Sequence, residues 1–280
     1  MSARAIPEGQ VTPDLARRAL GIALAVYGGY ALAGWMGVPG EARALALVAA
    51  FYFVPGWALR KDPDRARRWQ VGPESPIPPW SWRGARVAAW AGALVFPPFI
   101  VGFVWFYAQV CAGDLTWVSP LVALEGWTPW AGSLERFLGG LCRDYGGTPG
   151  LSDLRVPEAW RAYGGLGAVY YAAIELLVVA LPEEVFHRGF LMSALEARWP
   201  PRRRVGGVPF GLAAVLSSAV FAVGHLVGMA QAGRLATFAP GLLFAWLWKR
   251  SGSLWAPALF HAASNLLMSV LLATTFPGGS

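Results

Sequence analysis

The chain has 280 residues, of which 56% are hydrophobic and only 14% are charged, and its net charge is +7. A soluble domain carries roughly 25% charged residues, so this composition excludes an ordinary water-facing surface. The basic residues lie in short segments between long apolar runs, where Lys and Arg set membrane topology. They therefore predict a lipid bilayer, and no nucleic acid, as a partner.

Seven apolar runs follow one another along the chain. A membrane-crossing helix needs about 20 mainly apolar residues. The runs therefore predict an all-α fold, a polytopic membrane helical bundle with about seven to eight transmembrane helices. The predicted spans are Ala19–Val38, Ala44–Leu59, Val87–Cys111, Tyr163–Arg198, Phe210–Gln231, Leu235–Trp248 and Leu254–Phe276. The Trp-rich stretch Trp117–Leu141 is expected to lie at the membrane interface, and it is the eighth helix if it crosses.

The distribution of Lys and Arg predicts the orientation. Most of the 23 basic residues fall in segments that share a side with the N-terminus. We therefore expect a multi-pass protein of the cell inner (plasma) membrane with a cytoplasmic N-terminus. On that side, the Pro- and Arg-rich loop Arg60–Trp82 is expected to be a flexible connector. On the other side lies the long loop Ala112–Trp160, and the sequence leaves open whether Cys111 and Cys142 form a disulfide there.

The fourth predicted span carries charged residues in an apolar setting. Ionisable side chains inside membrane helices are costly, and those that are present usually face a cavity and act there. Glu183 and Glu184 are followed by Arg188 in this span. Glu184 and Arg188 are four residues apart, so their side chains can pair on a helix. The alternative is a charge cluster at the helix end, with Arg188 extended toward the lipid headgroups.

Two further spans carry polar pairs at the same spacing. Phe221 precedes His225 by four residues, and His261 precedes Asn265 by four. Each pair lies on one helix face, so Phe221 can hold the imidazole of His225. His261 and Asn265 can both donate hydrogen bonds into one cavity. The alternatives are a hydrogen-bonded packing histidine in the fifth span and polar contacts between helices in the seventh.

Together these residues form three motifs that resemble the signature of a known family, the type II CaaX prenyl endopeptidase and bacteriocin-processing family, also called CPBP or Abi. The motifs are Glu183-Glu184-x-x-x-Arg188, Phe221-x-x-x-His225 and His261-x-x-x-Asn265. The resemblance extends over about residues 168–273. It implies an all-helical membrane bundle with glutamic-type intramembrane protease activity. It also separates an N-terminal transmembrane region, 1–160, from a CPBP-like catalytic core, 161–280, within one integral membrane domain.

The resemblance implies a role for each motif residue. Glu183 is the base, His225 helps to hold the attacking water, and the oxyanion hole is formed by His261 and Asn265. The supporting residues are Glu184, Arg188 and Phe221. Peptide hydrolysis needs these parts: an activated water, a base, and donors for the oxyanion. We therefore expect the four catalytic side chains to converge, with Glu183 and His225 each about 3 Å from one water.

The alternative chemistry is a zinc site. Two histidines and a glutamate are adequate Zn²⁺ ligands. The sequence has no His-Glu-x-x-His motif, however, and the ligands would come from three helices. Asn265 would then have no role. We therefore expect no metal and no other cofactor, and zinc is kept as the alternative.

The predicted function is that of an intramembrane endopeptidase, in which a Glu/His-activated water cleaves a membrane-embedded or lipid-modified protein tail or peptide. Its partners are then a membrane protein or peptide substrate and the lipid bilayer, and the sequence predicts no oligomeric state. One alternative is a non-enzymatic membrane immunity or scaffold protein, and another is a zinc-dependent membrane protease. A proton-coupled transporter is a further alternative, against which the lack of visible inverted repeats counts.

Overall fold

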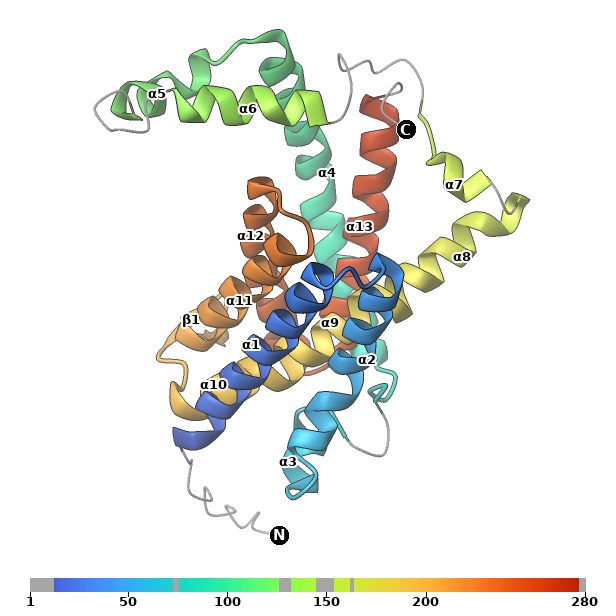
Figure 1. The fold of residues 1–280 in the computed structure, drawn as a ribbon, viewed down its shortest axis with the longest axis vertical. Coiled ribbons are helices and arrows are strands. Elements are labelled where there is room, and N and C mark those ends of the chain that lie inside the picture. Colours follow the sequence, from blue (N-terminus) through green and yellow to red (C-terminus); the bar gives the residue numbers. More distant parts are fainter. Residues whose placement is uncertain (1–12, 73–75, 126–131, 145–153, 162–163, 277–280) are drawn as a thin grey trace. The chain divides into compact units, whose positions relative to one another are not determined.

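The computed structural model describes residues 13–72, 76–125, 132–144, 154–161 and 164–276. It is 81% helical, which agrees with an all-α membrane protein, and Figure 1 shows its elements. Among the described residues, the departure from an all-α fold is one short antiparallel hairpin, in which strand β1 pairs with strand β2.

By packing, the chain divides into two compact units, which are described one at a time. The first unit comprises Met1–Ala89 and Leu176–His261, and the second comprises Trp90–Glu175 and Ala262–Ser280. The elements in chain order are α1 (Pro13–Trp35), α2 (Gly40–Ala58), α3 (Pro63–Arg68), α4 (Trp82–Ala112), η1 (Thr116–Val118), α5 (Ser119–Glu125), α6 (Ser133–Asp144), α7 (Glu158–Arg161), η2 (Gly164–Leu166), α8 (Gly167–Ile174), η3 (Glu175–Ala180), α9 (Leu181–Glu184), η4 (Val185–Met192), α10 (Ser193–Arg198), β1 (Arg203–Val205), β2 (Val208–Phe210), α11 (Leu212–Gly228), η5 (Ala232–Thr237), α12 (Phe238–Ser251) and α13 (Trp255–Thr275). The division of the sequence at residue 160 stays a prediction.

Each predicted span coincides with helical structure over most of its length. Two of the described helices, α4 and α13, are long and apolar enough to cross a membrane, and α11 is apolar but shorter. The number of seven to eight transmembrane helices stays a prediction. The stretch expected at the interface, Trp117–Leu141, contains α5 and the first part of α6, and its residues 126–131 lie outside the described residues.

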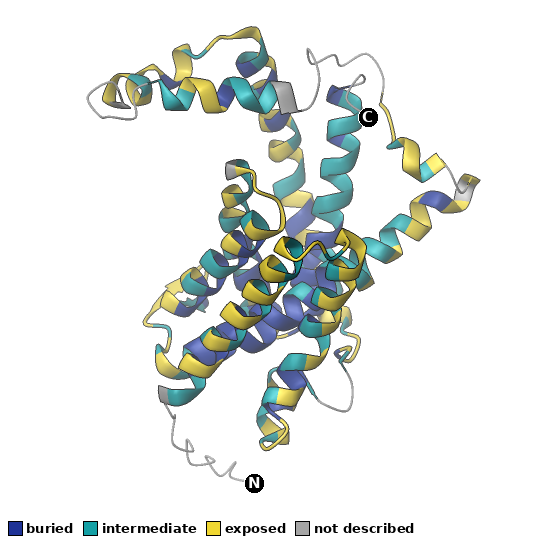
Figure 2. Cartoon of the chain, in the orientation of Figure 1, coloured by how far each residue is buried: buried dark blue, intermediate teal, exposed yellow. Residues whose placement is uncertain are grey.

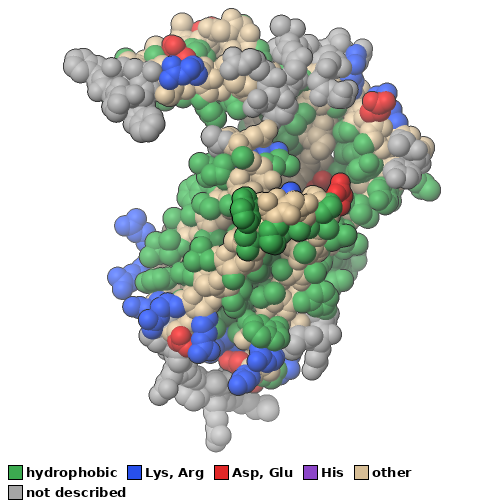
Figure 3. Space-filling view, viewed as in Figure 1, with side chains coloured by type: hydrophobic (Ala, Val, Ile, Leu, Met, Phe, Trp, Pro, Cys, Tyr) green, Lys and Arg blue, Asp and Glu red, His purple; other side chains and the backbone are tan. Residues whose placement is uncertain are grey.

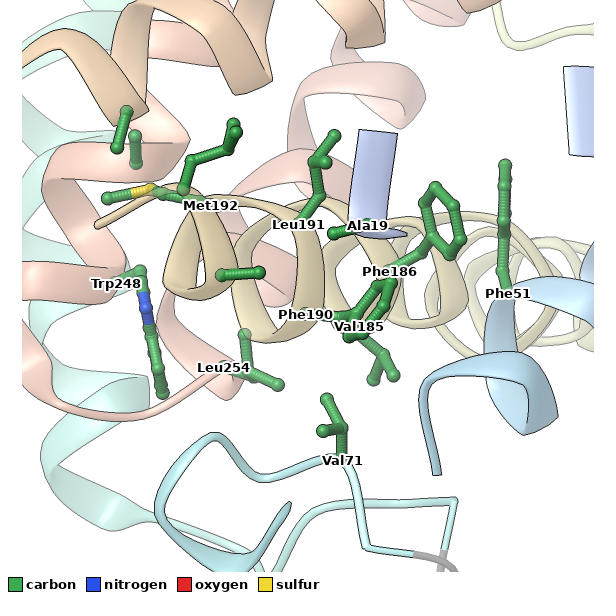
Figure 4. Close-up of a cluster of buried hydrophobic side chains, with 14 of the residues drawn as sticks. Ala19, Phe51, Val71, Val185, Phe186, Phe190, Leu191, Met192, Trp248 and Leu254 are labelled. Atoms are coloured by element: carbon green, nitrogen blue, oxygen red, sulfur yellow. The ribbon is translucent and has the colours of Figure 1, made fainter. Parts of the chain in front are cut away.

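The core of the first unit surrounds the helical run from α9 to α10, where Figure 2 shows the buried residues concentrated. Figure 4 shows Phe186, Phe190 and neighbouring apolar side chains of this run gathered with Ala19 of α1 and Phe51 of α2. The side of α1 that joins this core is lined by Ala16, Ala19 and Ala23, none more than 2% exposed. Small residues at such spacing let membrane helices approach closely, so packing rather than charge holds α1 on the run.

The prediction of a flexible connector over Arg60–Trp82 is wrong for its described part. The loop forms α3 and then inserts Val71, which is 1% exposed, into the core of the first unit. Gln70 has a left-handed backbone with φ of 57°. Its side-chain amide donates to the Gly252 carbonyl at 2.7 Å and accepts from the Leu254 amide at 3.1 Å. These two hydrogen bonds to the turn between α12 and α13 offset the backbone strain at Gln70.

In the second unit, a disulfide joins Cys111 at the end of α4 to Cys142 in α6. Beside it, Val110, Val118 and Leu138 form a small buried cluster that holds α6 against α4 and η1. The sequence had left this bond open. Disulfides persist in oxidising compartments, and the non-cytoplasmic side of this loop stays a prediction.

Charged and apolar side chains occupy different parts of the first unit's surface. On the face in view, Figure 3 shows mainly hydrophobic side chains over the middle of the first unit, whereas Lys and Arg gather at the end that carries α3, α10 and β1. Exposed members of this basic group include Arg202, Arg203 and Arg204. A surface of this kind suits a bilayer whose headgroups meet the basic end.

Candidate active site

The first motif lies in a helical run whose backbone hydrogen bonding alternates between the α-helical and the π-helical pattern. The segments η3 and η4, on either side of the four-residue helix α9, are π-helical. Since Pro182 has no backbone N–H, it cannot donate a π-type hydrogen bond to the carbonyl of Leu177, five residues earlier. Tyr52 of α2 donates to that carbonyl instead, at 2.5 Å. The irregular backbone next to the motif is thus satisfied by a side chain from another helix.

Glu183 differs from every neighbour in the buried run from Ala180 to Leu195. All the other residues of that run are buried, whereas the Glu183 side chain is 18% exposed. Its Oε2 atom is buried and accepts no hydrogen bond from any described residue. Buried polar atoms are nearly always satisfied by protein, water or ligand, so this oxygen marks a place for water or substrate.

His261 lies between the two carboxylates of the first motif. Its Nδ1 donates to Oε1 of Glu184 at 3.0 Å, and its Nε2 is 3.8 Å from Oε2 of Glu183. The second separation is too long for a direct hydrogen bond and short enough for one water to contact both atoms. The ring of Phe244 stacks on the imidazole with centroids 4.6 Å apart, and His261 is 4% exposed. The imidazole is therefore fixed beside the unpartnered oxygen of Glu183.

The ion pair expected between Glu184 and Arg188 is present and completely buried. Nη1 of Arg188 donates to Oε1 of Glu184 at 3.1 Å, and both side chains are 0% exposed. Nη2 donates to the Gly241 carbonyl of α12 at 3.0 Å. The guanidinium lies over the rings of Phe221 and Phe244, with Cζ 4.5 and 5.1 Å from their centroids. Arg188 thus connects the helical run from α9 to η4 with α11 and α12. Its side chain therefore does not extend to the lipid headgroups.

His225 is oriented by its own helix. Its Nδ1 donates to the Phe221 carbonyl at 3.0 Å, and the Phe221 ring lies 4.4 Å from the imidazole, centroid to centroid. In the neutral ring, the proton on Nδ1 leaves Nε2 as the atom that can accept a hydrogen bond. The same Phe221 ring is 5.8 Å from the ring of His261. The Phe221 ring therefore packs against the imidazoles of both His225 and His261.

The first unit brings together six of the seven residues predicted for the site: Glu183, Glu184, Arg188, Phe221, His225 and His261. Among these residues, His261 lies against the side-chain carboxylate of Glu183. A water shared by Glu183 and His225 stays a prediction. The catalytic and supporting roles assigned to these residues also stay predictions.

The seventh predicted residue, Asn265, belongs to the second unit. Its Nδ2 donates to Oε2 of Glu175 at 2.9 Å, and Glu175 lies in the same unit. The hydrogen bond orients the carboxamide and uses one of its two N–H groups, so the other remains for a ligand. Glu175 therefore holds Asn265 in one orientation.

Sequence reasoning missed three residues near these motifs. Glu175 falls inside the predicted fourth span and meets the same criterion as Glu183, an ionisable group in an apolar helix. His187 lies in the same span, and the sequence assigned it no role. Its contact Tyr27 lies in α1, more than 150 positions away, with Tyr27 Oη 2.8 Å from His187 Nε2. No periodicity within one segment predicts such a pair.

The zinc alternative needs a group of suitable ligands. Within the described residues, no group of three or more His, Cys, Asp and Glu side chains could hold a metal ion. The two nitrogens of His261 face Glu184 and Glu183 instead. The absence of a metal requirement stays a prediction, and a chelator tests it.

Comparison with known proteins agrees with the three motifs. Residues 165–267 match the family model described as type II CAAX prenyl endopeptidase Rce1-like. This segment contains every predicted catalytic residue and excludes α1 to α6. No curated protein and no solved structure matches the chain. The segment 165–267 is therefore similar to the Rce1-like CAAX protease family, and this similarity supports protease activity.

Proposed function

We propose that the protein is a glutamic intramembrane endopeptidase that hydrolyses a peptide bond in a membrane-associated protein tail or peptide and needs no metal ion. One observation carries the proposal. Glu183 is the single partly exposed residue in an otherwise buried run, and its unpartnered Oε2 is 3.8 Å from Nε2 of His261. A carboxylate in this setting suits the activation of a water molecule.

In the proposed reaction, the Glu183 carboxylate takes a proton from water as the water oxygen bonds to the peptide carbonyl carbon. Nε2 of His225 accepts a hydrogen bond from the same water and orients it. Asn265 donates to the carbonyl oxygen, which becomes negatively charged, and His261 donates to it through Nε2 in the doubly protonated form of its ring, because its Nδ1 already donates to Glu184. When the C–N bond breaks, Glu183 returns its proton to the leaving amine, so that a carboxylic acid and an amine are released.

Glu184 and Arg188 support this chemistry without meeting the substrate. Both are 0% exposed, and their ion pair is held between the motif helix and the Phe221 and Phe244 rings. Through its Oε1, Glu184 also orients His261. We infer that the pair fixes the relative positions of Glu183 and His261 to the precision that hydrolysis requires.

The proposed substrate is a polypeptide segment at or in the membrane. The family that residues 165–267 match is described as a prenyl endopeptidase, and a prenylated tail is accordingly one substrate to test. An unmodified C-terminal sorting or anchor segment and a peptide leader are the other two. All three present an extended peptide next to an apolar group, which suits a site among apolar helices.

The test is a comparison of two strains, one with the wild-type gene and one with the Glu183→Gln allele at equal protein level. Quantitative proteomics of the membranes should find at least one protein that keeps an uncleaved terminal segment only in the variant strain. Lys249→Ala, which alters an ion pair with Glu196 on another part of the first unit, is the control and should resemble the wild type. Identical processing in wild-type and Glu183→Gln strains would favour the immunity or scaffold alternative.

A further inference from the structure

Tyr27 brings the N-terminal helix α1 to the candidate site. Its hydroxyl lies 2.8 Å from Nε2 of His187, and Nδ1 of His187 lies 2.8 Å from the backbone carbonyl of Glu183. His187 is 0% exposed. A continuous chain of hydrogen bonds thus runs from α1 to the residue proposed as the base.

The direction of these hydrogen bonds follows from the acceptor at their end. A carbonyl oxygen only accepts, so Nδ1 of His187 carries a proton and donates to Glu183. In the neutral imidazole, Nε2 then has a lone pair, and the Tyr27 hydroxyl donates to it. Without that hydroxyl, a buried ring nitrogen would lose its partner, which is costly. Tyr27 therefore satisfies Nε2 in the tautomer of His187 that donates to the Glu183 carbonyl.

The ring of Tyr27 also touches the helix that carries His225. A Cβ atom added at Gly224, the residue before His225, would collide with Cζ and Oη of Tyr27. Only glycine permits this close approach. One side chain of α1 is thus in contact with η4, through His187, and with α11, through Gly224.

Two other contacts hold His187 in this position. Ser217 of α11 donates to the backbone carbonyl of His187 at 2.8 Å. The ring of Phe221 lies 5.0 Å from the imidazole at 84°, in an edge-to-face arrangement. His187 is therefore a fixed connection between α1, α11 and the turn that carries Glu183.

We propose that Tyr27 is a positioning residue for hydrolysis, which acts through His187 on the backbone of Glu183 and through Gly224 on the helix of His225. This inference rests on the proposed function. Tyr27 lies outside residues 165–267, so the N-terminal part of the chain completes the site of the family domain. In this arrangement the base and the water-orienting histidine are held at a fixed separation by a residue from neither helix.

The test removes the hydroxyl alone. In the purified full-length protein in liposomes, Tyr27→Phe should lower kcat about tenfold, the effect of one hydrogen bond, with KM changed less than twofold. Tyr30→Phe, one turn further along α1 with its ring under Arg43, is the matched control and should keep wild-type kinetics. An unchanged kcat in Tyr27→Phe would overturn the proposal.

A double-mutant cycle tests the route through His187. If Tyr27 acts through that imidazole, Tyr27→Phe should have no further effect on kcat in a His187→Leu background. If the double variant instead loses kcat by the product of the two single effects, the route through His187 is contradicted. A second pair of variants tests the contact with α11: Gly224→Ala should lower kcat, whereas Gly228→Ala, with open space at its Cβ on the same helix, should not.

A readout that needs no substrate separates this inference from the proposed function. The chain has 3 histidines, so ¹⁵N-histidine labelling gives few ring signals, and Tyr27→Phe should shift those of His187. Unshifted signals would overturn the inference even in an active enzyme. Shifted signals in a wild-type protein that cleaves no membrane-associated peptide would show the hydrogen bond while refuting the proposed function, and the role in hydrolysis with it.

Discussion

Truncation of Arg188 should destabilise the protein far more than truncation of an ordinary arginine. Arg188→Ala removes the hydrogen bonds to Glu184 and to the Gly241 carbonyl, at 3.1 and 3.0 Å. It leaves the carboxylate of Glu184 at 0% exposure with His261 as its remaining partner. Breaking a buried ion pair in this way costs about 3–5 kcal/mol. For a chain of this size, that corresponds to a fall in Tm of roughly 10 °C.

The assay is thermal unfolding in detergent, followed by circular dichroism, with Arg67→Ala as the control. Arg67 pairs with Asp64 at the surface, where the side chains are 68% and 73% exposed, so its loss should cost about 0–1 kcal/mol. The double variant Glu184→Gln/Arg188→Met should recover part of the stability because no unpaired charge remains buried. If Arg188→Ala unfolds at the same temperature as Arg67→Ala, the assignment of Arg188 as a buried structural cation is refuted.

Three further predictions concern the oxyanion hole, the metal and the inserted loop. Asn265→Ala should reduce turnover by about 10²–10³ with KM nearly unchanged, and Glu175→Gln, which weakens the hold on Asn265, should reduce it less; wild-type kinetics in Asn265→Ala would remove it from the site. EDTA should leave cleavage intact, whereas loss of activity that added Zn²⁺ restores would support the zinc alternative. Gln70→Ala should lower the free energy of unfolding by about 1–3 kcal/mol, measured by chemical denaturation, because both of its hydrogen bonds to the turn after α12 are lost; an unchanged value would show that the loop is not held there.

The helices were predictable because long apolar runs leave the chain few alternatives in a membrane. The predicted span Ala44–Leu59 is the helix Gly40–Ala58, and Leu254–Phe276 is Trp255–Thr275. The pairing of Glu184 with Arg188 was also predictable, since it depends only on spacing within one helix. Local periodicity therefore predicted the positions of the helices and the side-chain contacts within a single helical run.

Features that depend on two distant segments were not predictable. The π-helical segments around Pro182 require a donor from another helix, which Tyr52 supplies. The ordered loop after α3 depends on the fit of Gln70 to the turn at Gly252. The contact of Tyr27 with His187 joins α1 to the motif helix. In each case the deciding interaction is tertiary, and the sequence shows only one of its partners at a time.

The central claim is that Glu183 activates the water. The most direct measurement is single-turnover cleavage by Glu183→Gln in liposomes, on a substrate found by the membrane proteomics, with binding measured separately. Glutamine keeps the size and polarity of the side chain but cannot take the proton. The account predicts that the cleavage rate falls by about 10²–10⁴, while the substrate Kd and the Tm stay near wild type. A Glu183→Gln variant that binds and cleaves at the wild-type rate would contradict the account.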